Sequence, residues 1–110
     1  MDDKVLNMLG LASKARKIIA GSDAVMREIK ANRAKIVLIS NDSSPKTIDN
    51  FRKKCYFYKI PCLVKYKTEE ISQSIGKFNH VIAINDPNFS GILLKYLESE
   101  IEFNERKGNS

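Results

Sequence analysis

Apolar residues recur along this chain with two periods, one typical of helices and one typical of buried strands. A helix is predicted over about residues 3 to 15, with one apolar face formed by Val5, Leu6, Leu9 and Ala12. Asp2 and Asp3 precede that face, where negative charge favours the start of a helix. Short continuous apolar runs predict four strands, at residues 17–20, 35–40, 62–66 and 81–84.

Four more helices are predicted between and after these strands. Ser22 or Asp23 is expected to cap the second helix, which Asn32 ends. Residues 41–45 supply a turn, a cap and a proline in the first turn of the third helix. The last two helices begin near Thr68 and Asp86, and Gly76 closes the fourth.

The alternation of helices and strands predicts an α/β fold, a three-layer α/β/α sandwich with helices on both faces of the sheet. A chain of 110 residues with 43% hydrophobic residues suffices for one compact domain. We expect this domain over residues 1–104, followed by a polar tail at residues 105–110.

Composition indicates the cellular compartment and argues against zinc sites and disulfide bonds. No apolar run approaches the ~20 residues needed to cross a bilayer, and the acidic start argues against a cleavable signal. We therefore expect a cytoplasmic protein without a membrane partner. Cys55 and Cys62 are too few for a zinc site or a disulfide scaffold and are expected to be buried thiols.

Charge is unevenly distributed along the chain. The net charge is +6, with 15 Lys and Arg against 6 Asp and Glu in residues 1–67 and 4 against 7 in residues 68–110. This asymmetry predicts a basic face, for which nucleic acid and a plainly solvated surface are alternative interpretations. The basic residues Lys14, Arg16, Lys17 and Arg27 flank a Gly21-Ser22-Asp23 turn. A helix that opens there presents N–H groups to a polyanion such as phosphate.

Enzyme signatures are missing from the sequence. Glycine-rich dinucleotide and nucleoside triphosphate loops do not occur, so we expect no cofactor and no metal. His80, the single histidine, begins an apolar run and is interpreted as a surface or packing residue. Asp42 follows a buried strand, where catalytic carboxylates occur, but its Ser- and Pro-rich context favours a turn and helix cap.

Aromatic and basic residues alternate in the third helix, over residues 51–59. Such a mixture can stack bases and neutralise phosphates. Phe51 and Tyr58 fall on the predicted apolar stripe, however, so most of this aromatic surface is interpreted as core, with the lysines toward solvent.

Motifs spaced over most of the chain resemble the ribosomal-protein family of kink-turn RNA binders, the L7Ae type. They lie at residues 9–17, 21–27, 34–42, 60–61 and 75–76, with Cys55. Residues 9–17 are similar to the bacterial YlxQ-like branch, small proteins described as ribosomal or RNA-binding. The resemblance implies an α/β/α sandwich with a four-stranded mixed sheet that binds sharply bent RNA.

In this family a Gly-x-Asn-Glu-x-x-Lys segment enters the groove at tandem sheared G·A pairs. The matching positions are Gly21, Asp23, Ala24 and Arg27. Arg27 matches the family's lysine and keeps its positive charge. Asp23 stands where the family has an asparagine, and its carboxylate accepts a hydrogen bond from a guanine amino group but repels phosphate. Ala24 lacks the carboxylate, a loss of about 1 to 3 kcal/mol for a buried base contact. Arg16 stands where the bacterial branch commonly has Gly.

The resemblance maps a second RNA contact to the loop at residues 76–80. Phe78 would stack on an extruded base with Lys77 on its phosphate, or the aromatic ring would simply close the sheet edge. We expect a non-enzymatic, monomeric RNA-binding protein, with ribosomal RNA as partner, gripped by Lys14, Arg16, Lys17, Gly21, Ser22, Asp23, Arg27, Lys77 and Phe78. The alternative is a module that docks on a protein of the translation or transcription machinery and binds RNA weakly.

Overall fold

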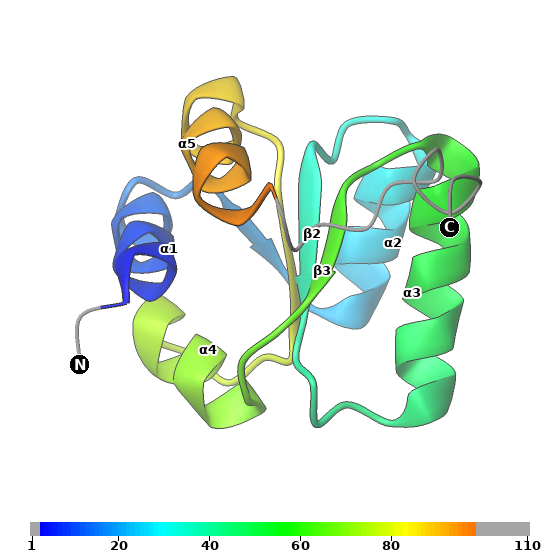
Figure 1. Cartoon of the computed structure of the whole chain (residues 1–110), viewed down its shortest axis with the longest axis horizontal. Coiled ribbons are helices and arrows are strands. Elements are labelled where there is room, and N and C mark those ends of the chain that lie inside the picture. The colour runs from blue at the N-terminus through cyan, green and yellow to red at the C-terminus, as the bar shows by residue number, and fades with distance from the viewer. Residues whose placement is uncertain (1–2, 99–110) are drawn as a thin grey trace.

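Helices cover both faces of one sheet in the computed structural model, which describes residues 3–98 (Figure 1). The elements are α1 (Lys4–Lys14), β1 (Ile18–Ala20), α2 (Ser22–Lys30), β2 (Ile36–Ile39), α3 (Pro45–Tyr58), β3 (Cys62–Val64), α4 (Thr68–Ile75), β4 (Val81–Ile84) and α5 (Pro87–Leu97). This order and the α/β/α sandwich confirm the predicted fold. The predicted domain boundary at residue 104 and the tail at 105–110 lie outside the described residues.

The sheet is mixed and has the strand order β1-β4-β2-β3. β4 runs antiparallel to both of its neighbours, with Ile82 opposite Ala20 on one side and Leu38 on the other. β2 and β3 are parallel and are joined by α3. Because β4 is antiparallel to β1 and β2, the end of β1, the end of β2 and the start of β4 meet at one end of the sheet.

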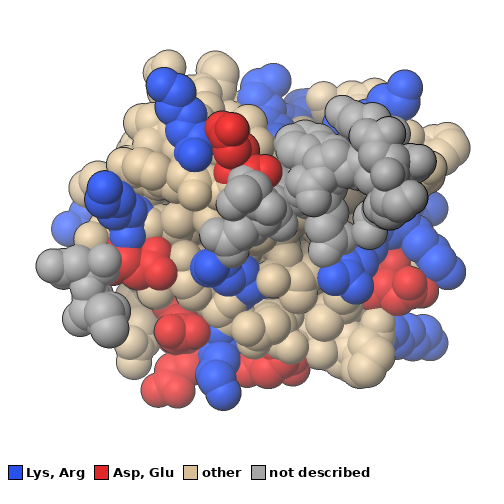
Figure 2. All heavy atoms as spheres, in the orientation of Figure 1, with Lys and Arg blue, Asp and Glu red and all other residues tan. Residues whose placement is uncertain are grey.

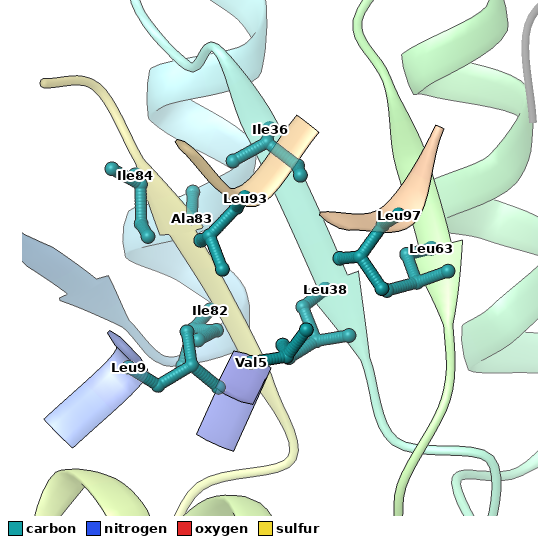
Figure 3. A pocket seen from close by; sticks show the side chains of 10 residues that line it. All are labelled: Val5, Leu9, Ile36, Leu38, Leu63, Ile82, Ala83, Ile84, Leu93 and Leu97. Atoms are coloured by element: carbon teal, nitrogen blue, oxygen red, sulfur yellow. The ribbon is translucent and has the colours of Figure 1, made fainter. Parts of the chain in front are cut away.

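The central strands separate two cores, because alternate residues point to opposite faces. Leu38 and Ile82 face α1, α4 and α5, whereas Val37 and Val81 face α2 and α3. Figure 3 shows ten side chains from the sheet, α1 and α5 around a remaining void of about 10 Å³. A void of that size and apolar lining is at the lower limit for one water molecule, so it holds no ligand.

Cap residues explain where several helices begin. Ser44 accepts a hydrogen bond from the Thr47 N–H and precedes Pro45, as predicted. Asp86 accepts from the Phe89 N–H at the start of α5. Gly76 ends α4 with φ 81°, also as predicted. Cys55 and Cys62 are buried thiols, as expected.

Two predicted caps were wrong. Gly21, rather than Ser22 or Asp23, is the N-cap of α2, because the strand pairing extends to a bond from Gly21 N–H to the Val81 carbonyl and the chain turns there. Asp42 does not cap α3. Its Oδ1 accepts from the Thr68 N–H at 3.0 Å and from the Thr68 hydroxyl at 2.6 Å, so it fixes the start of α4.

Asp3 ties the first helix to the far end of β3. Its Oδ1 accepts from the Val5 and Leu6 N–H groups at 2.9 and 3.1 Å and from the Tyr66 hydroxyl at 2.8 Å. Burial raises the pKa of Asp3, but these hydrogen bonds together with the Lys65 charge outweigh it, and the pKa lies below its ordinary value.

Within residues 3–98, no helix combines the length and apolar character that crossing a membrane requires.

Replacing Asp3 should therefore destabilise the fold in a pH-dependent way. Asp3→Ala removes a helix cap and the partner of Tyr66, and should lower the free energy of unfolding by about 1 to 2 kcal/mol at pH 7. A lowered folded-state pKa contributes stability above the ordinary aspartate value of about 3.9, and this contribution disappears as pH falls through the folded-state value. Urea unfolding at pH 7 and pH 2.5 measures both effects.

Asn7→Ala provides the control, because Asn7 is exposed on the same helix and should change stability by less than about 0.5 kcal/mol at either pH. An Asp3→Ala deficit of equal size at both pH values would contradict the role of the ionised carboxylate.

Candidate RNA-binding surface

The start of α2 is an uncapped helix terminus. Gly21 has φ 101° and ψ 145°, a conformation that glycine adopts without a steric penalty, and it provides no side chain to cap the helix. The first N–H groups of α2 therefore lack a capping side chain and carry partial positive charge. Ser22 and Asp23 occupy the first two helical positions, with the Asp23 side chain exposed. Asp23 makes this terminus better suited to a base amino group than to phosphate.

The loop of residues 76–80 lies beside this terminus. A Cβ atom built on Gly21 would come within 3.7 Å of the Asn79 side-chain oxygen. The Ser72 hydroxyl accepts from the Asn79 N–H at 3.0 Å, which holds the loop against α4. The structure thus brings together two predicted contact regions that are more than fifty residues apart in the sequence.

Phe78 projects from this loop. Its side chain is 79% exposed, so it does not close the edge of the sheet. Lys77 is also exposed, and with Phe78, Asp42 and Thr68 it borders a shallow groove along α4. Of the two interpretations of Phe78, the sheet-closing one is wrong, and the ring presents its surface to solvent.

Lys14 joins the same region through contacts between α1 and α4. The Ser13 hydroxyl donates to the Ile75 carbonyl at 2.8 Å, which places the end of α1 next to the start of the 76–80 loop. Lys14 and Gly76 both line a groove between these two helices. An exposed cation therefore stands beside the loop that carries Phe78.

Lys17 lies at the opposite end of β1 from Gly21. Its Nζ is 3.8 Å from Asp86 Oδ1, at the N-terminus of α5. β1 has three residues, so the two ends are separated by about 10 Å of backbone. The predicted site is thus divided, because Lys17 belongs to the end of the sheet where β4 finishes.

Arg16 adopts a left-handed backbone conformation with φ 61°. Its N–H donates to the Ser13 carbonyl and the Lys17 N–H donates to the Ala12 carbonyl, which closes the end of α1 in a tight turn. For a residue with a Cβ atom, this conformation costs about 1 to 2 kcal/mol. The position thus has the backbone that suits glycine and carries an exposed guanidinium instead.

Arg27 is exposed on α2, somewhat more than one helical turn after the helix start. The face in Figure 2 has Lys and Arg scattered over its middle and its rim, with Asp and Glu between several of them. On that face no continuous basic patch dominates.

Sequence reasoning missed the roles of Asn79 and Ser72. They hold the loop next to Gly21, yet a single Asn before a strand and a Ser within a helix carry no recognisable signal.

Hydrogen bonds from the Thr68 side chain hold the pKa of Asp42 below its ordinary value. His80 is half-buried, in line with its interpretation as a surface or packing residue. Within residues 3–98, no cluster of three or more His, Cys, Asp or Glu residues is arranged to hold a metal ion.

Two curated proteins are similar to this chain over most of their length. It is 38% identical over 92 residues to a protein named "RNA-binding protein YlxQ" from Bacillus subtilis, a match that covers 83% of this chain and 92% of that protein. A protein of the same name from Enterococcus faecium is 37% identical over 87 residues, which cover 79% of this chain and 84% of the relative. The relatives' names agree with the expectation that the chain is not an enzyme.

Solved structures share the fold. A Bacillus halodurans protein described as having unknown function superposes with a TM-score of 0.81 at 30% identity, covering 86% of this chain and 96% of that one. A Giardia lamblia 15.5kD RNA binding protein superposes with a TM-score of 0.77 at 14% identity, over 90% and 92% of the two chains, which is a likeness of fold. The model of the ribosomal protein L7Ae/L30e/S12e/Gadd45 family matches residues 3–94, and the chain belongs to this family.

Proposed function

We propose that this protein binds RNA, and that it recognises a bent, kink-turn-like element through the start of α2 and the 76–80 loop. The observation that carries the proposal is the proximity of Gly21 and Asn79, which joins an uncapped helix terminus to a loop with an exposed aromatic ring. The names of the two curated relatives support RNA as the ligand class.

Each side chain has a defined task in this proposal. Gly21 lets the RNA backbone approach closely, and Asp23 accepts from a guanine amino group. Arg27 grips phosphate or a guanine edge with two parallel hydrogen bonds. Phe78 stacks on an extruded base, and Lys77 and Lys14 neutralise phosphates nearby.

The cellular setting follows from the ligand. Ribosomal RNA is the proposed target, because it is the abundant structured RNA that a family of ribosomal proteins encounters. The protein then acts in the cytoplasm as a monomer associated with the ribosome. Binding stabilises the kinked conformation by selecting it from a dynamic RNA ensemble.

A titration with two RNAs tests the proposal. A kink-turn duplex and the same duplex with its tandem G·A pairs replaced are titrated at several salt concentrations. Preference for the kinked RNA is the expected result, since Asp23 and Arg27 contact it specifically. Equal affinity with steep salt dependence would instead indicate phosphate contacts alone. Absence of binding to both would favour docking on a protein partner, the function motivated by Asp23 and Ala24.

Replacing Arg27 should weaken recognition of the kinked RNA. Arg27→Ala removes a bidentate contact, and a loss of about 1 to 3 kcal/mol, roughly 5- to 150-fold in Kd, is expected. Lys30→Ala is the matched control, because Lys30 is exposed at the far end of the same helix. Equal losses for the two variants would contradict a specific role for Arg27.

Replacing Arg16 should separate stability from binding. Arg16→Gly relieves the left-handed strain at the cost of greater unfolded-state freedom, so stability should rise by up to about 1 kcal/mol. Affinity for RNA should fall, because the exposed Arg16 guanidinium is proposed to contact phosphate next to Lys14. Arg16→Gln removes the charge while keeping a Cβ atom, and should lower affinity without raising Tm. A gain in Tm for the Gln variant as large as for the Gly variant would contradict the strain explanation.

A further inference from the structure

The outward face of α3 carries a second set of exposed aromatic and basic side chains. Phe51 and Cys55 face the core and are 3% and 1% exposed. Tyr56 and Phe57, on the opposite side of the helix, are 58% and 73% exposed. The prediction that most aromatic surface here is core thus holds for Phe51 and fails for these two rings.

Phe57 contacts the neighbouring aromatic ring despite its exposure. Its ring meets the edge of the half-buried Tyr58 ring, with centroids 5.0 Å apart and an interplanar angle of 81°. This contact anchors one side of Phe57 and leaves most of the ring to solvent. A pre-positioned aromatic ring loses little conformational entropy when a flat partner stacks on it.

Positive charge is concentrated along the helix that carries these two rings. α3 carries Lys46, Arg52, Lys53 and Lys54 against a single acid, Asp49, and Lys59 follows its last turn. Lys53 and Asp49 form a pair at 3.1 Å, but both side chains are largely exposed, so a phosphate can replace the carboxylate. Stacking rings flanked by cations suit a flexible strand that offers both bases and phosphates.

The aromatic rings lie far from the start of α2. α3 begins after β2, at the end of the sheet where α2 starts, and ends where β3 begins. Its 14 residues span about 21 Å, and Figure 1 shows α3 running along the outside of the same layer as α2. Tyr56 and Phe57 are therefore at the opposite end of this layer from Gly21.

We propose that the outward face of α3, centred on Tyr56 and Phe57 with Lys53 and Lys59, is a second binding surface for single-stranded RNA. The proposal rests on the proposed function for the ligand class alone. A bent duplex at the start of α2 and an unpaired strand on α3 then occupy separate surfaces. The protein holds a single-stranded RNA segment that the kink-turn contacts do not reach.

The test uses a 12-nucleotide oligouridine, which forms no stable duplex, and the full chain. The chain contains no tryptophan, so Phe57→Trp introduces a single tryptophan, whose emission is separable from that of the tyrosines, and keeps an aromatic ring on the surface. Oligouridine should quench its fluorescence with saturation. Tyr56→Ser combined with Phe57→Ser should weaken oligouridine binding about tenfold or more. Lys53→Gln combined with Lys59→Gln should reduce the salt slope by about 1.4, or 0.7 for each lost phosphate contact.

Lys95→Gln combined with Tyr96→Ser is the matched control, since both residues are exposed on α5, in the other helical layer. This control should bind oligouridine like the unsubstituted protein. Unchanged oligouridine binding by the Tyr56 and Phe57 double variant, at an unchanged Tm, would overturn the proposal. A tryptophan response to phosphatidylserine vesicles with none to oligouridine would also overturn it and would assign the surface to a membrane.

Failure of this inference and failure of the proposed function are distinguishable. The Tyr56 and Phe57 double variant should retain its affinity for a kink-turn duplex without single-stranded ends. Arg27→Ala should retain its affinity for oligouridine. If kink-turn preference is absent while oligouridine binding still depends on Tyr56 and Phe57, the function at α2 fails and the α3 surface stands.

Discussion

Burial of both faces of the β4–β2 pair is the constraint on which the rest of the structure depends. Every residue of Ile36–Ile39 and Val81–Ile84 is buried, so each strand needs helices on both sides. α1, α4 and α5 cover one face and α2 and α3 the other. Because β4 is antiparallel to its neighbours, the same pairing brings Gly21 next to Val81 and the preceding loop. The strand pairing in the core thus also positions the candidate RNA surface.

The sequence predicts the elements better than their connections. Continuous apolar runs and helical periodicity identified the four strands and five helices, because burial dictates residue type at each position. The N-cap of α2 and the hydrogen bonds that Asp42 accepts from the start of α4 depend on contacts between distant segments. The Gly21 N–H donates to the Val81 carbonyl, which sets Gly21 as the N-cap, and Asp42 accepts hydrogen bonds from Thr68, 26 residues away. Such long-range contacts leave no local pattern.

For the candidate site too, the sequence indicated the regions involved but not all of their arrangement. The resemblance to a family located the start of α2 and the 76–80 loop, and the structure places these regions side by side. Lys17 lies apart from them, because β1 separates it from Gly21, and this distance is not apparent from their proximity in sequence. The exposure of Tyr56 and Phe57 follows from helical periodicity, because both lie on the opposite side of α3 from Phe51 and Cys55. The contact between the Phe57 and Tyr58 rings, by contrast, leaves no pattern in the sequence.

The two outer strands of the sheet, β1 and β3, have three residues each. An edge strand exposes unpaired N–H and C=O groups that another chain can extend, and the hazard grows with strand length. Here each edge ends after a few residues, at the Gly21 turn on one side and the left-handed Tyr66 on the other. The sheet therefore offers little template for growth into larger assemblies, which leaves its helical faces as the surfaces for recognition.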